Sequence, residues 1–257
     1  MTRTHIDFLG IAFDPYDMAA TEAWLAERPP HAPFAFVITP NVDHVVKLDA
    51  APAEAEIRQA YAAAALRLCD SRIVARLART RGIDLPVVPG SDLTAHLVTR
   101  IAEAGDRLCL IGGDAAMLHD LRALRPDLDI VQHIPPMGML TRPAAMAEAE
   151  AFVRDARARF TLLAVAMPQQ EILALRVAKA GGAVGTGLCI GASLDFLTGR
   201  KARAPLWMRK ASLEWLHRLL SEPRRLWRRY LVEGPRIFLL TMRWRKAGAP
   251  SPEPGPN

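Results

Sequence analysis

The chain has 257 residues, of which 51% are hydrophobic and 23% are charged, the composition of a globular protein with a substantial core. Its net charge is +6, no apolar run reaches the roughly 18 residues of a membrane span, and the first residues lack the apolar segment of a secretory signal. Three widely spaced cysteines (Cys69, Cys109 and Cys189) indicate buried thiols rather than disulfides or metal ligands, which predicts a cytoplasmic protein.

Predicted strands and helices alternate along residues 1–199. Short apolar runs bounded by turn residues predict strands, and longer segments with apolar residues at helical spacing predict helices. In chain order these are an apolar run over 6–12, a helix over 18–26, a strand over 34–39, a helix over 53–66, a strand over 67–69, a helix over 73–81, a helix from its N-cap Ser91 to about Ala104, a strand over 108–111, a helix over 115–124, a strand over 128–132, a helix over 144–158, a strand over 160–166, a helix over 169–180 and a strand over 183–190. The alternation predicts an α/β fold with a mostly parallel, Rossmann-like sheet and helices on both faces.

Residues 200–246 differ sharply from the rest of the chain. They carry 14 Lys and Arg against 3 Glu, a net charge of +11, whereas residues 1–199 have a net charge of −4. Four of the five tryptophans lie in this basic segment, among leucines at helical spacing. The pattern is typical of amphipathic helices on an anionic membrane surface, although a solvated face or a nucleic-acid site would use similar charges. We predict an α/β catalytic body over 1–199, a basic helical membrane-binding appendage over 200–246 and a disordered tail over 247–257.

Polar and glycine-rich residues follow the predicted strands. They are Thr39 and Asn41, Asp70, Gly112 and Gly113, Pro168 to Glu171, and Gly187 to Gly191. Parallel strands end at one edge of a sheet, where α/β proteins bind their ligands, so we expect these residues to gather there. The residue types leave alternatives open. A Gly-Gly turn suits a phosphate or is only a tight turn, and Asp70 suits a helix cap as well as a base.

Several common catalytic motifs are absent from the sequence. There is no nucleophile elbow, no Walker motif, no dinucleotide-binding fingerprint and no paired-histidine metal motif. The one D-x-D run, Asp127-Leu128-Asp129, falls at a predicted helix-to-strand junction, which is the wrong end of the sheet for a metal-diphosphate clamp. We therefore expect a reaction that needs no metal and no other cofactor.

Eight runs of residues together resemble one family. They are Thr39-Pro40-Asn41, Asp70, 89–93, 110–113, 168–171, 195–200, 204–208 and 214–230. Through these runs residues 6–240 are similar to the WecG/TagA/CpsF glycosyltransferases (glycosyltransferase family 26). The resemblance implies an inverting, metal-independent transfer of N-acetylmannosamine, N-acetylmannosaminuronic acid or glucose from a UDP-sugar to a polyprenyl-diphosphate-linked sugar. It also implies a peripheral protein on the inner face of the cell membrane, in cell-surface or exopolysaccharide biosynthesis, with a monomer–oligomer equilibrium.

The resemblance implies a role for each matching residue. Asp70 matches the proposed general base, Thr39 and Asn41 match a polar pair of the sugar pocket, and Gln170 matches a catalytically important glutamine. The resemblance places UDP at the strand-end turns and the lipid diphosphate at arginines of the appendage, which suit phosphate oxygens. The turn residues are Gly112, Gly113, Pro168, Glu171, Gly187 and Gly191, and the arginines are Arg218, Arg225 and Arg228.

The chain departs from the family pattern close to the expected site. Ser71 stands where the family usually has Gly, and Arg72 stands where an apolar residue is usual. One hypothesis is that Arg72 binds a carboxylated donor sugar; the alternative is a solvated arginine. Two other functions are considered for the whole chain, a non-catalytic membrane scaffold and a nucleic-acid-binding protein. The presence of Thr39, Asn41, Asp70 and Gln170 argues against a scaffold, which needs none of them.

Overall fold

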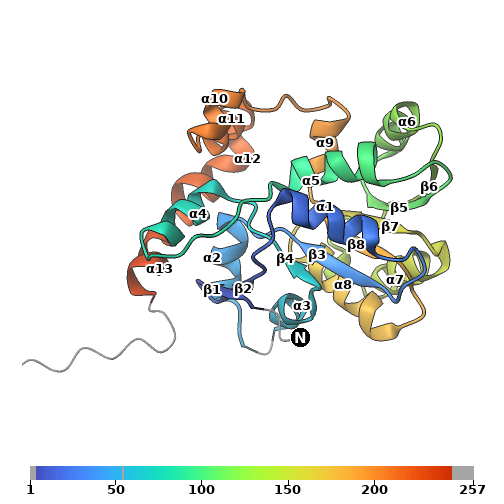
Figure 1. Cartoon of the computed structure of the whole chain (residues 1–257), viewed down its shortest axis with the longest axis horizontal. Coiled ribbons are helices and arrows are strands. Elements are labelled where there is room, and N and C mark those ends of the chain that lie inside the picture. Colours follow the sequence, from blue (N-terminus) through green and yellow to red (C-terminus); the bar gives the residue numbers. More distant parts are fainter. Residues whose placement is uncertain (1–3, 54, 245–257) are drawn as a thin grey trace, which may run out of the picture.

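A central sheet of six parallel strands organises the protein (Figure 1). The computed structural model describes residues 4–53 and 55–244. The strand order is β4-β3-β8-β7-β5-β6. The strands are β3 (Ala35–Ile38), β4 (Leu66–Arg67), β5 (Arg107–Gly112), β6 (Asp129–His133), β7 (Phe160–Ala164) and β8 (Thr186–Cys189). The predicted α/β fold with a parallel, Rossmann-like sheet is confirmed.

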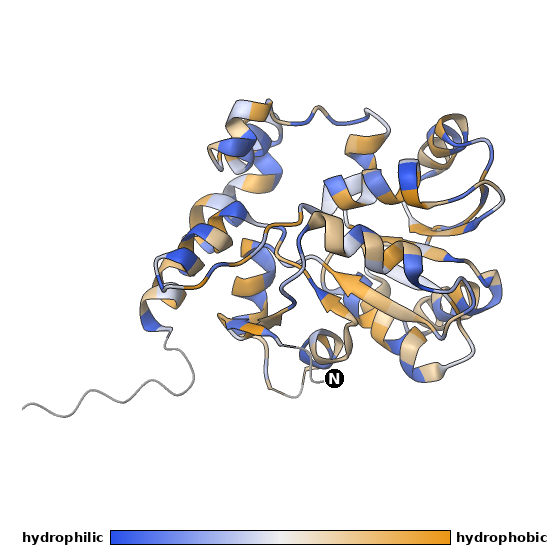
Figure 2. Ribbon diagram, viewed as in Figure 1, coloured by the Kyte–Doolittle hydropathy of each residue, from blue (hydrophilic) through white to orange (hydrophobic). Residues whose placement is uncertain are grey.

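The inner strands are apolar on both faces because helices cover both sides of the sheet. In β5, Cys109 and Ile111 pack in one buried cluster, whereas Leu108 and Leu110 pack in the other. Figure 2 shows this concentration of hydrophobic residues along the strands. Alternation along each strand therefore divides the core into two layers.

Helices supply the other half of each layer. The first cluster contains residues of α2 (Val42–Ala50), α3 (Glu56–Ala63), α4 (Arg72–Arg79), α7 (Pro143–Ala156) and α8 (Gln169–Ala180), and also of an antiparallel hairpin, β1 (Ile6–Phe8) and β2 (Ile11–Phe13). The second contains residues of α1 (Met18–Glu27), α5 (Gly90–His96), the π-helical turn Leu97–Ile101 that continues α5, and α6 (Ala115–Leu124). A single 3-10 turn, Met139–Thr141, precedes α7.

Three local expectations were wrong. The helix expected at 53–66 is confined to α3, and α2 was not expected at all, although Asn41 is a good N-cap for it and its side chain accepts from the Asp43 N–H at 3.1 Å. Ser91 is not the N-cap of α5, because the helix begins at Gly90. The Gly90 N–H is satisfied by Asp70, 20 residues earlier in the chain, so a tertiary contact replaces the local cap.

The C-terminal helices lie beside α2 and α4 at one end of the sheet (Figure 1). They are α10 (Leu206–Lys210), α11 (Glu214–Ser221), α12 (Pro223–Trp227) with the π-helical turn Arg228–Glu233, and α13 (Arg236–Arg243). An extended connection joins them to α9 (Ser193–Leu197), and four ion pairs hold that connection: Arg200–Asp114, Lys201–Asp195, Lys201–Glu222 and Arg203–Asp92. The predicted tail 247–257 lies outside the described residues.

One apolar anchor and several hydrogen bonds attach these helices to the body. Ile237 of α13 is 1% exposed and belongs to the first core cluster. Trp244 packs edge-on against Phe8 with ring centroids 5.1 Å apart. Arg76 of α4 donates to the carbonyls of Lys210 and Ala211, both at 3.2 Å, and so ties α4 to the turn before α11. The N-terminus of α4 therefore lies opposite the C-terminal helices.

Candidate functional site

Two adjoining cavities lie at the carboxyl edge of the sheet. The first, here called the strand-end cavity, has a volume of about 410 Å³ and lies at the ends of β3, β5, β7 and β8. The second, called the appendage cavity, has a volume of about 370 Å³ and lies between the residues that follow β3 and β4 and the C-terminal helices. The two cavities share four lining residues, namely Asn41, Asp43, Arg218 and Arg229. The predicted gathering of strand-end residues is therefore present, but in two compartments.

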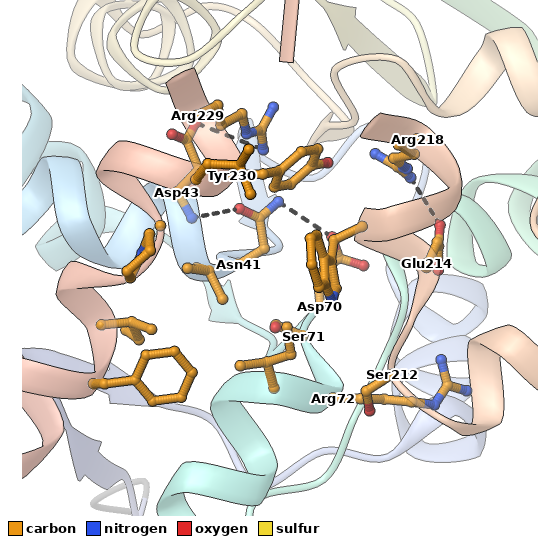
Figure 3. A pocket seen from close by; sticks show the side chains of 18 of the residues that line it. Asn41, Asp43, Asp70, Ser71, Arg72, Ser212, Glu214, Arg218, Arg229 and Tyr230 are labelled. Atoms are coloured by element: carbon orange, nitrogen blue, oxygen red, sulfur yellow. Dashed lines mark hydrogen bonds and ion pairs between the residues drawn. The ribbon is translucent and has the colours of Figure 1, made fainter. Parts of the chain in front are cut away.

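Asp70 lines the appendage cavity directly after β4 (Figure 3). Its Oδ1 accepts from the Gly90 N–H at 2.7 Å, and its Oδ2 faces the Asn41 Nδ2 at 3.5 Å. Ser71 caps α4 by accepting from the Val74 N–H, so Asp70 does not cap its own helix. The carboxylate is instead held between two loops and faces open space.

Burial raises the pKa of Asp70 to about 6. The Gly90 N–H, the nearby Arg218 guanidinium and the Asn41 amide each pull that pKa down, and the neighbouring Glu214 pushes it up. Loss of water contact therefore outweighs the groups that favour the charged form. A carboxylate with such a pKa is ionised at pH 7 yet accepts a proton more readily than an ordinary aspartate.

Gln170 lies at the floor of the strand-end cavity, on the first turn of α8. It is 3% exposed, its Oε1 accepts from the Gly191 N–H at 2.9 Å and its Nε2 donates to Glu171 at 2.8 Å. Thr39 and Gly191 line the same cavity. A backbone N–H and a buried carboxylate thus fix the glutamine from both sides.

The predicted UDP-binding residues separate into two groups. Gly113 and Gly191 line the strand-end cavity. Gly112 and Gly187 are buried in the sheet, packed against Ala164 and Phe34, and line neither cavity. Pro168, which follows a cis peptide bond, also lines neither, and Glu171 is fully buried behind Gln170. The position of a residue at a strand end correctly predicts which loops line the cavity. Burial then determines which residues of those loops are exposed to it.

The three predicted arginines also differ in placement. Arg218 lines both cavities, pairs with Glu214 at 2.9 Å and stacks over Phe196 at 4.8 Å. Arg225 lines the strand-end cavity and pairs with Glu222. Arg228 lines neither cavity; its side chain is 73% exposed and pairs with Glu233. One helical turn in the appendage therefore separates an arginine that faces the site from one that faces solvent.

Sequence reasoning missed several residues that line the site. Arg229 lies 3.6 Å from Asp43, and both line both cavities (Figure 3). His44, which follows Asp43 on α2, contacts Asn41 at 2.9 Å. Asp43 and His44 could have been found from Asn41, because this N-cap residue places both of them on the first turn of α2, which faces the cavity. Others that were missed are Arg209, Glu214 and Tyr230, and only the i, i+4 spacing of Glu214 to Arg218 hints at them.

Two features are absent from the described residues, a cluster of metal ligands and a membrane-spanning helix. Within residues 4–53 and 55–244, no cluster of three or more His, Cys, Asp or Glu side chains has the placement of a metal site. In that same part of the chain, no helix has the length and apolarity to cross a membrane. The expectation of a metal-free reaction stays a prediction.

The fold and the site together define a class of protein. A parallel sheet that presents a desolvated carboxylate and several arginines at its carboxyl edge suits an enzyme that transfers a group between anionic substrates. In a comparison with protein families, the model described as the glycosyl transferase WecG/TagA/CpsF family matches residues 6–250. The chain belongs to the WecG/TagA/CpsF family of glycosyl transferases.

Proposed function

We propose that the protein is an inverting glycosyltransferase that moves a sugar from a UDP-sugar to a polyprenyl-diphosphate-linked sugar, with Asp70 as the general base. The observation that carries the proposal is the position and pKa of one carboxylate. Asp70, with a pKa of about 6, lies beside Asn41 where the two cavities adjoin. A general base works best with a pKa near the operating pH, and two adjoining cavities suit a donor and an acceptor.

The proposed reaction is a single displacement. The acceptor hydroxyl oxygen attacks the anomeric carbon and forms the new glycosidic bond, while the bond from that carbon to the UDP oxygen breaks and UDP leaves with the electron pair. The hydroxyl proton passes to the Asp70 carboxylate. Attack from the face opposite the leaving group inverts the anomeric centre, and the proposal includes no metal.

The strand-end cavity is the proposed donor site. It is lined by the turns of Gly113 and Gly191 and by the buried Gln170. The first turn of α6 follows Gly113, and the partial positive charge of a helix N-terminus offsets the charge that develops on the departing diphosphate. Thr39 and Asn41 lie on the side of this cavity nearest Asp70, where the transferred sugar belongs.

The appendage cavity is the proposed acceptor site. Four guanidinium groups line it, from Arg72, Arg209, Arg218 and Arg229, against the carboxylates of Asp43, Asp70 and Glu214. Arginine binds phosphate oxygens bidentately, so this surplus of cations suits a diphosphate. Arg72 lines this cavity and not the strand-end cavity, so we assign it to the acceptor rather than to a carboxylated donor sugar.

The outer surface of the appendage is the proposed membrane-binding surface. Large apolar side chains that are more than half exposed and line neither cavity occur throughout the C-terminal helices; they are Leu206, Trp207, Leu220, Trp227, Val232, Leu239 and Met242. Exposed arginines lie among them, for example Arg224 and Arg236. Apolar insertion combined with attraction to anionic head groups would hold the open side of the acceptor site at the lipid surface.

The test is sugar transfer from a panel of UDP-sugars to a short-chain polyprenyl-diphosphate-sugar acceptor. Wild type is compared with Asp70→Asn and with the control Asp84→Asn, whose carboxylate is 92% exposed. We expect one donor to be used, a loss of about a hundredfold or more in Asp70→Asn and no change in the control. NMR of the product would report inversion of the anomeric centre.

Two other outcomes would change the proposal. Full activity in Asp70→Asn would keep the enzyme and move the base elsewhere. No transfer from any donor, together with no UDP binding by calorimetry, would favour the non-catalytic membrane scaffold.

A further inference from the structure

We propose that His44 and Glu171 act as a positioning pair that fixes the amide groups of Asn41 and Gln170 in one orientation each. The inference rests on the proposed function, which places both amides at the reaction site. His44 thereby gains a role, and Glu171 supports Gln170 instead of contacting UDP. Glu171 is fully buried and lines neither cavity, whereas His44 reaches from α2 towards it across the floor of the strand-end cavity.

The orientation of Asn41 follows from one backbone contact. The Asp43 N–H can only donate, so the Asn41 atom that it contacts at 3.1 Å is the carbonyl Oδ1. The amide nitrogen Nδ2 then points to Asp70 Oδ2. His44 Nδ1 lies 2.9 Å from the same Oδ1, so that ring nitrogen carries a proton and donates it to Asn41. His44 thus adds a second donor that holds the Asn41 oxygen away from Asp70.

The orientation of Gln170 follows in the same way from its contact with the Gly191 backbone. The Gly191 N–H donates to Gln170 Oε1 at 2.9 Å, so the Gln170 amide nitrogen faces Glu171. That nitrogen donates to Glu171 Oε1 at 2.8 Å. The Glu171 oxygen is therefore an acceptor, and it is also the oxygen that lies 3.5 Å from His44 Nε2. A series of contacts thus runs from Asp70 through Asn41, His44, Glu171 and Gln170 to Gly191. The Asp43 and Gly191 N–H groups determine which atom donates in each of these contacts except the one between His44 and Glu171.

The remaining contact is between His44 Nε2 and Glu171 Oε1. An unpaired buried carboxylate is strongly destabilising, and among the described residues His44 is the only basic side chain within ion-pair distance of Glu171. Burial, with the nearby Glu171, raises the pKa values of Tyr61 and Cys189 well above their usual ranges, so both neighbours stay neutral. The charged residues that line the strand-end cavity together with His44 are Asp43, Lys47, Asp195, Arg218, Arg225 and Arg229. The His44 ring therefore contacts Asn41 through Nδ1 and faces the Glu171 carboxylate through Nε2, at 2.9 and 3.5 Å.

The pair matters because Asn41 acts on the general base. Its amide N–H favours the charged form of Asp70 and so lowers the pKa of that carboxyl. Without His44, only the Asp43 N–H holds the Asn41 oxygen, so the amide rotates more readily, and its oxygen repels the carboxylate when it faces Asp70. The contact between His44 and Glu171, on the first turn of α8, is therefore linked through Asn41 to the proton affinity of Asp70.

The test is the titration of the Asp70 carboxyl carbon by NMR in the full-length protein. The variants are His44→Leu, Asn41→Ala, the double variant and His44→Asn, whose amide nitrogen occupies the place of the imidazole Nδ1. We expect His44→Leu to raise the midpoint by about half a pH unit, the size of a weak charge-assisted hydrogen bond. Asn41→Ala should raise it similarly, the double variant should show no further rise, and His44→Asn should restore the wild-type value.

The controls separate positioning from general damage. His119 is an exposed histidine of α6, and His119→Leu should leave the midpoint unchanged. An unchanged midpoint in a folded His44→Leu protein, or shifts that add in the double variant, would overturn the proposal. The titration needs no substrate, so it gives its answer even if the protein transfers no sugar. If transfer is observed, the acid limb of the kcat profile should move with the NMR midpoint.

Discussion

The strand-end cavity and the appendage cavity hold their functional side chains by different means. In the first, Gln170 is almost fully buried and is fixed by the Gly191 backbone and by Glu171. In the second, Glu214 is held by an i, i+4 partner, Arg218, on its own helix and is one-quarter exposed. Backbone contacts cannot adjust without moving the sheet, whereas partly exposed ion pairs exchange with solvent and ligands. The side chains of the proposed donor site are therefore held more firmly than those of the proposed acceptor site.

The attachment of the appendage strengthens this contrast. Its connection to the body runs through ion pairs at the protein surface, such as Arg200–Asp114 at 2.7 Å, which lowers the pKa of Asp114 to about 2. Its main apolar anchor is Ile237. Surface ion pairs weaken as salt rises, whereas the apolar anchor does not. We therefore expect the attachment of the appendage to depend on salt more than the packing of the sheet does.

The largest effect expected within the appendage separates two of its arginines. Arg218→Ala should lower transfer about thirtyfold, because it removes a cation that faces both cavities and Asp70. Arg228→Ala should change transfer less than about twofold, because its side chain faces solvent. The comparison uses initial rates with a short-chain acceptor in detergent. Equal losses in the two variants would mean that the appendage rearranges when substrate binds and that the contrast between the cavities is wrong.

A smaller effect concerns the outer surface of the same helices. Trp227→Ser combined with Leu220→Ser should reduce binding to anionic vesicles about tenfold, since each removes an exposed apolar side chain from the proposed membrane surface. Leu124→Ser is the matched control, because Leu124 is 44% exposed on α6 and should not affect sedimentation with vesicles. Equal binding by the double variant and wild type would place the membrane contact elsewhere.

The smallest effect is on stability and comes from the raised pKa of Asp70. The folded-state pKa, about 6, lies above the unfolded value near 3.8, so the carboxyl stabilises the fold below pH 4 and loses that contribution as pH rises to 6. Asp70→Asn mimics the protonated form. We expect it to raise the free energy of unfolding by about 1–2 kcal/mol at pH 7.5, after allowance for solvent in the cavity, and to change little at pH 4.

Urea denaturation at the two pH values measures this difference. If Asp70→Asn destabilises the protein equally at both pH values, the charge of Asp70 does not destabilise the folded state. The expected result, more stability with less activity, is the usual consequence of removing a functional charge from a desolvated position.

Much of the fold was accessible from residue patterns alone. Largely apolar runs such as 108–111 and 160–166 predicted inner strands of a parallel sheet, and these are β5 and β7. The helix α2 was missed because its amphipathic pattern is short, and the cap of α5 was wrong because Asp70 supplies it from a distant loop. Local patterns predict elements well when the driving force is local, and they fail where a tertiary contact supplies the missing partner.

The sequence by itself determined the sheet, the family and the loops that carry the candidate site, because burial on both faces and strand-end chemistry leave direct traces in residue order. Only the tertiary structure decided which residues of those loops act together. Glu171 and Gly187 turned inward, Arg229 rather than Arg228 faced the cavities, and His44 came between Asn41 and Glu171. These outcomes depend on the direction of single side chains across packed elements, which the spacing of residues along the chain does not record.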